Sequence, residues 1–172
     1  YDAIKEFFPT SMVGAAINMM PFFPLRKLHP GDRLVSNYLD RVYNYSYLDS
    51  LLKGKLVKPL GNGEAAPEIS SKLDFIGINY YTRIFVKYSK PLPEIAVGNE
   101  FEKTEMGYEF FPQGIEDVIL KAYKRYQLPI IITENGIADA SDTRRWEYIE
   151  KALTGVRNAM EKGARVFGYM YW

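Results

Sequence analysis

The pattern of apolar residues along this chain changes repeatedly between two forms. In the first form, a continuous apolar run ends in a polar residue or a turn, which is typical of a buried strand in a parallel sheet. Four such runs occur, at residues 13–20, 73–81, 130–135 and 166–172. The third is Ile130-Ile131-Ile132-Thr133-Glu134-Asn135-Gly136, and we expect it to be a strand buried on both faces that stops at a sharp turn.

In the second form, apolar residues recur every three or four positions, which indicates a helix with one buried face. These stretches are residues 36–53, 112–126 and about 142–162. The buried stripe expected in the first is Leu39, Val42, Tyr43, Tyr47 and Leu51. In the second it is Ile115, Val118, Ile119, Ala122, Tyr123 and Tyr126, and in the last it is Trp146, Ile149, Leu153, Val156 and Met160. Strands that alternate with amphipathic helices predict an α/β fold, in which helices cover a parallel sheet.

The remaining segments give weaker signals. Residues 1–8 are expected to be the tail of a helix that ends before Pro9. Residues 21–36 contain three prolines and are expected to form a loop, with His29 as a rim residue and Ser36 as the cap of the following helix. Residues 82–111 form a long insertion, for which the sequence leaves both a hairpin and a mobile loop open; such insertions often carry specificity in enzymes.

Size and charge narrow the class of protein. The 172 residues suffice for one domain with a sizeable core, and 22 basic residues balance 21 acidic ones. A net charge of +1 gives no electrostatic reason to expect nucleic acid or an anionic membrane as a partner. No apolar run approaches the roughly 20 residues of a membrane span. No signal-peptide pattern is present, so we expect a cytoplasmic protein.

Composition also restricts the chemistry. The chain has no cysteine and one histidine, His29, so disulfides, thiolate nucleophiles and the usual zinc sites are unavailable. A glycine-rich phosphate fingerprint after the first strand is missing, and we expect neither a metal nor a cofactor. The 14 Tyr, 10 Phe and 2 Trp fit a ring-stacking cleft, although a large aromatic core explains the same count.

Polar and aromatic residues stand where the predicted strands end. In parallel sheets and barrels the carboxyl ends of the strands carry the functional residues. Here these ends hold Asn18, Asn79 with Tyr81, Glu134 with Asn135, and Trp172. The period of two along a strand puts Asn79 and Tyr81 on the same face. Glu134 is the one carboxylate among them, and a carboxylate is costly to bury unless it faces a polar cleft or a partner. The pattern alone leaves a structural ion pair and a catalytic carboxylate equally open.

Four segments in order resemble one enzyme family. Ile132-Thr133-Glu134-Asn135-Gly136 resembles the nucleophile signature of family-one glycoside hydrolases, the retaining β-glucosidase and β-galactosidase family. The segments 74–82, 111–114 and 167–172 resemble three further segments of that family, although Gln113 replaces the commoner Glu. Across the four segments, the sequence resembles most the archaeal branch of this family.

The resemblance implies a (β/α)8 TIM barrel, of which this chain supplies about the fifth to the eighth strand, with an insertion at about 82–111. It implies that Glu134 is the nucleophile of a retaining β-glycosidase and that Tyr81 hydrogen-bonds and orients it. Asn79 and Trp172 are implied to bind the substrate, a small or oligosaccharide β-glycoside. A retaining mechanism pairs an ionised carboxylate with a protonated one, roughly 5–5.5 Å apart.

The chain departs from the family at both ends. It lacks the Asn-Glu-Pro segment that carries the acid/base, and the family residues beyond Trp172. A whole barrel takes about 250 residues, so we expect residues 1–172 to be the C-terminal half of one catalytic domain, inactive alone. The N-terminal half of the barrel is then expected on the same chain or on a separate chain. The sequence leaves open whether the whole enzyme is a homo-oligomer. The alternatives are a catalytically silent glycan-binding relative and an unrelated parallel-sheet protein with an ion pair at Glu134.

Overall fold

The computed structural model describes residues 1–96 and 101–172. In chain order its elements are α1 (Asp2–Phe7), β1 (Gly14–Asn18), β2 (Phe22–Pro24), α2 (Pro30–Lys53), the short 3₁₀ helix η1 (Pro67–Ile69), β3 (Phe75–Tyr80), β4 (Ile84–Lys87), β5 (Glu94–Ala96), α3 (Gly114–Tyr126), β6 (Ile130–Asn135), α4 (Arg145–Glu161) and β7 (Val166–Tyr171). The four main strands and the three long helices predicted from the sequence are therefore present.

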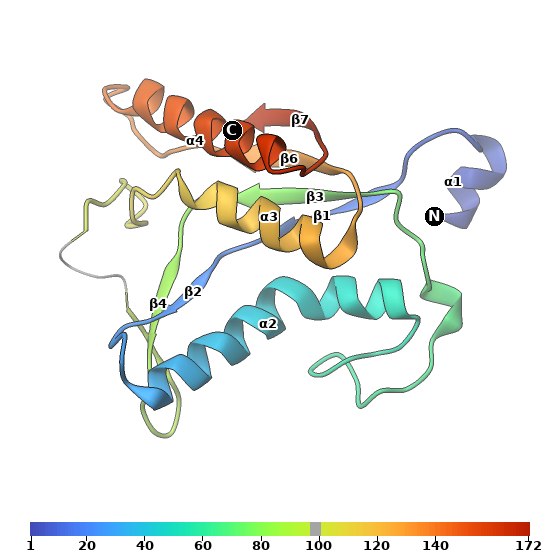
Figure 1. The fold of residues 1–172 in the computed structure, drawn as a ribbon, viewed down its shortest axis with the longest axis horizontal. Coiled ribbons are helices and arrows are strands. Elements are labelled where there is room, and N and C mark those ends of the chain that lie inside the picture. The colour runs from blue at the N-terminus through green and yellow to red at the C-terminus, as the bar shows by residue number, and fades with distance from the viewer. Residues whose placement is uncertain (97–100) are drawn as a thin grey trace.

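The main sheet has the strand order β1-β3-β6-β7, and every neighbouring pair is parallel. Figure 1 shows α3 between α2 and α4. Leu48 of α2, Ile119 of α3 and Val156 of α4 belong to the same buried cluster as Ile76 and Ile132 of the sheet. The three helices thus cover one face of the sheet, as the alternation of strands and helices predicts.

The third predicted strand, β6, is fully buried on one face only. Ile130 and Ile132 point into the helix layer and are completely buried, whereas Ile131 and Thr133 on the opposite face are half-buried. The prediction of burial on both faces is therefore wrong for the second face. Among the described residues, no helix is both long and apolar enough to cross a lipid bilayer.

A second, smaller sheet was not predicted. Its order is β2-β4-β5, in which β2 and β4 are parallel and β4 and β5 form an antiparallel hairpin. As Figure 1 shows, β2 and β4 continue the paths of β1 and β3 towards the start of α2. The described part of the insertion at 82–111 thus contains a hairpin, one of the two alternatives left open, while residues 97–100 lie outside the described residues.

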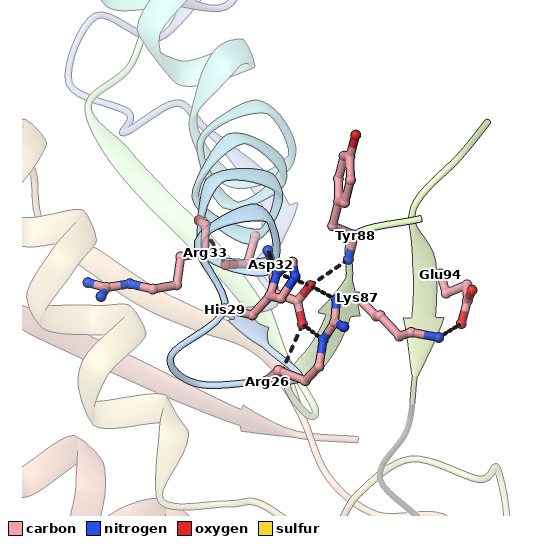
Figure 2. A network of polar contacts seen from close by, with 8 residues as sticks. Arg26, His29, Asp32, Arg33, Lys87, Tyr88 and Glu94 are labelled. Carbon is pink, nitrogen blue, oxygen red and sulfur yellow. Dashed lines mark hydrogen bonds and ion pairs between the residues drawn. The ribbon is translucent and has the colours of Figure 1, made fainter. Parts of the chain in front are cut away.

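The expected loop at 21–36 is wrong in its second half, because α2 begins at Pro30. His29 caps this helix: its Nδ1 accepts a hydrogen bond from the backbone N–H of Asp32. The completely buried Asp32 carboxylate binds the side chain of Arg26 at two points and accepts from the backbone N–H of Tyr88, as Figure 2 shows. Asp32 thereby joins the start of α2 to the segments that follow β2 and β4. Ser36 lies inside the helix rather than at its cap, because the helix begins at Pro30.

The predicted stripe of α2 is wrong at two positions, because Tyr43 and Tyr47 are exposed. Polar side chains occupy much of the buried face instead. Asn44 accepts a hydrogen bond from the N–H of Met20 and donates one to its C=O, and Asp49 binds Arg125. These groups are buried at low cost because each has a partner.

The predicted stripe of α4 is wrong at Trp146, Leu153 and Met160, which are all exposed. The buried face of α4 is made of small residues with Tyr148 and Val156, and Gly155 lies where α4 meets α3. A Cβ at Gly155 would stand 2.8 Å from a methyl carbon of Ile115. The two helices pack so closely that the large apolar residues of α4 face outward.

Asp49 gives a test of how α2 and α3 are held together. Burial raises its pKa, but hydrogen bonds from Arg125, Lys53 and Tyr126 outweigh that effect and hold the pKa at about 2. Because the pKa is lower in the folded state, the carboxylate stabilises the fold above its unfolded pKa of roughly 4. The stabilisation is lost as the pH falls towards 2.

In the full-length chain that carries residues 1–172, we therefore expect Asp49→Asn to lower the free energy of unfolding by about 2 kcal/mol at pH 7. The difference from the parent should shrink between pH 5 and pH 2, as measured by urea unfolding. The matched control is Asp142→Asn, because Asp142 also pairs with an arginine but is 69% exposed. A pH-independent loss in Asp49→Asn would contradict the prediction.

Candidate active site

The carboxyl ends of the parallel strands bring the predicted site residues together. In the sheet register, Asn18 of β1 pairs with Asn79 of β3, and Asn79 pairs with Glu134 of β6. On the other side of β6, the backbone N–H of Trp172 donates to the carbonyl of Asn135, 2.9 Å away. Residues up to 154 positions apart in the chain therefore line one edge of the sheet.

Glu134 and Tyr81 are in direct contact. The Tyr81 hydroxyl donates a hydrogen bond to Oε2 of Glu134 over 2.7 Å, and both side chains are half-buried. Burial raises the pKa of Tyr81, and the hydrogen bond and charge of Glu134 raise it further. The phenol therefore stays protonated at working pH, so that Tyr81 is a lasting donor to the Glu134 carboxylate.

Asn79 and Trp172 lie in different surroundings. Asn79 stands beside Glu134 in the sheet, but its side-chain oxygen accepts a hydrogen bond from the Thr133 hydroxyl. The side chain of Trp172 is 77% exposed at the mouth of a cavity. Its backbone passes so close to Gly136 that a Cβ there would stand 2.1 Å from the Trp172 carbonyl oxygen. The turn after Glu134 therefore requires glycine at this position.

Asn135, which the sequence places beside Glu134 at the end of the strand, is buried, and its contacts were not predicted. Its amide nitrogen donates to the carbonyl of Tyr80 on β3 and to the hydroxyl of Tyr148 on α4. Its amide oxygen accepts from the hydroxyl of Tyr169 on β7 over 2.7 Å. The fully buried side chain thus ties the end of β6 to both neighbouring strands and to the helix layer.

A cavity of about 640 Å³ opens beside Tyr81. Its lining comes from β1, the end of β3, the insertion, the segment after β6, the start of α4 and the end of β7. The residues are Asn18, Tyr81, Thr104, Glu105, Met106, Tyr108, Gly136, Ile137, Ala138, Asp139, Ala140, Arg145 and Trp172. No sequence pattern predicted that side chains of the insertion line this cavity. The one indication was that long insertions often carry specificity in enzymes.

Two carboxylates line the cavity, Glu105 and Asp139, and both accept hydrogen bonds. Glu105 accepts a hydrogen bond from the backbone N–H of Ala140. Asp139 accepts from the Ser141 hydroxyl and from the backbone N–H of Arg144, which lower its pKa, so it is an ionised group and a poor proton donor. Within the described ranges, no three acidic or histidine side chains gather as metal ligands would.

The contact between Tyr81 and Glu134 leads to a test. In the full-length chain we expect Tyr81→Phe to lower kcat/KM for an aryl β-glycoside about 10- to 100-fold, because one charge-assisted hydrogen bond to the carboxylate is lost. The matched control is Tyr123→Phe, since Tyr123 lies on α3 and its hydroxyl meets Arg165. Equal activity of both variants would contradict a role for Tyr81.

The fold and the site together define a class. Functional side chains at the carboxyl ends of parallel β/α strands are the arrangement of barrel enzymes, and carboxylates are the catalytic groups of most glycoside hydrolases. The chain belongs to glycosyl hydrolase family 1, because the sequence profile of that family matches residues 1–172. The predicted family resemblance is therefore confirmed.

Individual relatives agree with this assignment. A β-galactosidase of Sulfolobus acidocaldarius is 34% identical to this chain over an alignment of 184 residues. The alignment covers 100% of this chain and 36% of the relative. β-Glucosidase A of Acetivibrio thermocellus is 33% identical over 73% of this chain and 34% of its own length. A solved β-glycosidase structure from Pyrococcus horikoshii superimposes with a TM-score of 0.86 at 33% identity and covers 99% of this chain and 40% of that protein.

The chain therefore spans little more than a third of the length of these relatives. Two of the three come from archaea, which agrees with the predicted archaeal-like branch. The structural match confirms the expected fold class, an incomplete (β/α)8 barrel.

Proposed function

We propose that residues 1–172 carry the nucleophile of a retaining β-glycosidase that hydrolyses O-glycosidic bonds of β-glucosides or β-galactosides. The observation that carries the proposal is the 2.7 Å hydrogen bond from Tyr81 to Glu134 at the carboxyl ends of the strands. Membership of the family supports it, and so do relatives named β-galactosidase and β-glucosidase. Asn79 and Trp172 are proposed as substrate-binding residues beside the nucleophile.

In the proposed reaction, an Oε atom of Glu134 attacks the anomeric carbon of the sugar and forms a covalent glycosyl-enzyme. The bond from that carbon to the glycosidic oxygen breaks, and an acid partner protonates the departing oxygen. Water then attacks the same carbon and gives its proton back to the acid partner, which now acts as a base. The ester to Glu134 is cleaved, and the configuration of the sugar is retained. The hydroxyl of Tyr81 orients the carboxylate before the attack.

We also propose that residues 1–172 by themselves do not hydrolyse glycosides. The sequence contains no Asn-Glu-Pro segment, and the two carboxylates that line the cavity, Glu105 and Asp139, are bound by neighbouring groups. Protonation of the leaving group then requires a carboxyl group from the rest of the barrel. Turnover of an aryl β-glucoside by the isolated segment at an enzyme-like rate would contradict this.

A mechanism-based 2-deoxy-2-fluoroglycoside given to the full-length chain tests the proposal. The fluorine slows hydrolysis of the covalent intermediate, so the sugar should remain on the nucleophile. Mass spectrometry of proteolytic peptides should then find one sugar on Glu134. A label on any other carboxylate defeats the assignment, and no label together with no turnover would favour a glycan-binding relative. The same experiment with fluoroglucosides and fluorogalactosides reports the preferred sugar.

A further inference from the structure

Arg83 is enclosed by aromatic rings near the site. Its guanidinium carbon lies 3.9 Å from the ring centroid of Phe111, 4.8 Å from that of Phe85, 5.2 Å from that of Phe101 and 5.3 Å from that of Phe23. Phe23 lies on β2 and Phe85 on β4. Phe101 and Phe111 lie on either side of residues 102–109. A planar guanidinium surrounded by π-faces has little freedom to move.

Glu109 is the ionic partner of Arg83. The Glu109 carboxylate accepts hydrogen bonds from Nε and Nη2 of Arg83, at 2.9 and 2.8 Å. The Glu109 side chain is only 5% exposed. The two-point geometry fixes direction as well as distance. A buried ion pair of this kind contributes little net stability against an apolar replacement but defines position.

On one side, the pair holds the segment that follows Tyr81. Arg83 is two residues beyond Tyr81, and the hydroxyl of Thr82 between them donates to the backbone carbonyl of Glu109 over 3.0 Å. The carbonyl of Tyr81 accepts a hydrogen bond from the Tyr148 hydroxyl. The backbone around Tyr81 is therefore fixed by Glu109 and by α4, which sets where the Tyr81 phenol meets Glu134.

On the other side, Glu109 ends a short hairpin, residues 102–109, which we call the cleft hairpin. Lys103 and Glu109 form an antiparallel bridge, and the N–H of Thr104 donates to the carbonyl of Tyr108. Near its tip, the Glu105 carboxylate accepts from the N–H of Ala140, beyond β6. The cleft hairpin thus spans the cavity from the end of β3 to the segment after Glu134, and four of its residues line the cavity.

We propose that the Arg83–Glu109 pair is a positioning element that fixes Tyr81 and the cleft hairpin together against Glu134. The proposal rests on the proposed function of Glu134. Loss of the pair then has two effects at once. The rate per active site falls because Tyr81 no longer aligns the carboxylate, and large leaving groups bind less well because one wall of the cavity loosens.

The test uses the double variant Arg83→Met/Glu109→Gln in the full-length chain. It removes both charges without leaving a buried charge unpaired, and it keeps the side-chain length that fills the ring of phenylalanines. The matched control is Lys87→Met/Glu94→Gln, which makes the same changes to an exposed ion pair in the same insertion. Active sites are titrated with the fluoroglycoside, so that misfolded protein does not count.

For an aryl β-glycoside we expect the double variant to lose about tenfold in kcat per titrated site and to raise KM about tenfold, while KM for the methyl glycoside of the same sugar changes less than about twofold. The control should match the parent. Parental kcat per site and parental KM values in the double variant would overturn the proposal, because a purely structural pair alters only the fraction of folded protein.

Hydrogen exchange followed by mass spectrometry tests the pair independently of turnover. Amide exchange in residues 102–109 should be about tenfold faster in the double variant and unchanged in the control. Parental protection of this segment would overturn the proposal, whatever the activity. If the full-length chain labels no carboxylate and hydrolyses no glycoside, the proposed function fails, and exchange still decides whether the pair positions the cleft hairpin.

Discussion

Replacing Glu134 with glutamine in the full-length chain is expected to lower kcat for an aryl β-glycoside by about 10⁴-fold or more. Glutamine has nearly the same shape and still accepts a hydrogen bond from Tyr81, so the fold and the cavity are retained. It carries no negative charge and is a poor nucleophile at the anomeric carbon. Steady-state kinetics of purified, correctly folded variant would measure the loss.

The matched control for this substitution is Glu116→Gln. Glu116 lies on α3, where its carboxylate binds Asn158 and Lys162 on the helix layer, so activity should stay within about twofold of the parent. If Glu134→Gln kept more than about one hundredth of the parental rate, the assignment of the nucleophile would be wrong.

Asn135→Leu is expected to lower the free energy of unfolding of the full-length chain by about 3 kcal/mol. The substitution leaves the carbonyl of Tyr80 and the hydroxyls of Tyr148 and Tyr169 without their buried partner. Burial raises the pKa of Tyr169 to about 12, so this phenol remains a donor and cannot relieve the cost by ionising. Urea unfolding at pH 7 measures the difference.

Asn158→Leu is the control for Asn135→Leu. Asn158 also donates a hydrogen bond from its amide, but to Glu116 at the partly exposed contact of α4 with α3. We expect a cost below about 1 kcal/mol there. Similar costs at the two positions would show that the bridge between β6, its neighbouring strands and α4 adds no stability of its own.

The spacing of apolar residues predicted where the helices and the main strands lie. It did not always predict which face of a helix or strand is buried. The stripe of α3 was right at Ile115, Val118 and Ile119, which are all buried. It failed on α4, because the close contact through Gly155 with α3 excludes large side chains such as Trp146. A pattern of apolar positions does not contain the distance between two helices, which decides which of two faces is covered.

The site was predictable as far as it depends on strand ends. Period two placed Asn79 and Tyr81 on one face, and the parallel sheet brought Tyr81 to Glu134. Contacts made by the insertion were not predictable, because Arg83 and Glu109 are 26 residues apart without a regular spacing. The three partners of Asn135 were not predictable either, since they lie on three different elements and only the fold brings them together.

The way the cleft hairpin is fastened has a consequence for protein engineering. Glu109 fixes one end of the cleft hairpin and Glu105 fixes it near the tip, whereas Met106, next to Glu105, is 66% exposed and lines the cavity. Its side chain can therefore be exchanged without disturbing the contacts that hold the backbone. A saturation library at Met106 would vary the preference for leaving groups while the catalytic geometry stays constant, which makes this position a natural start for directed evolution.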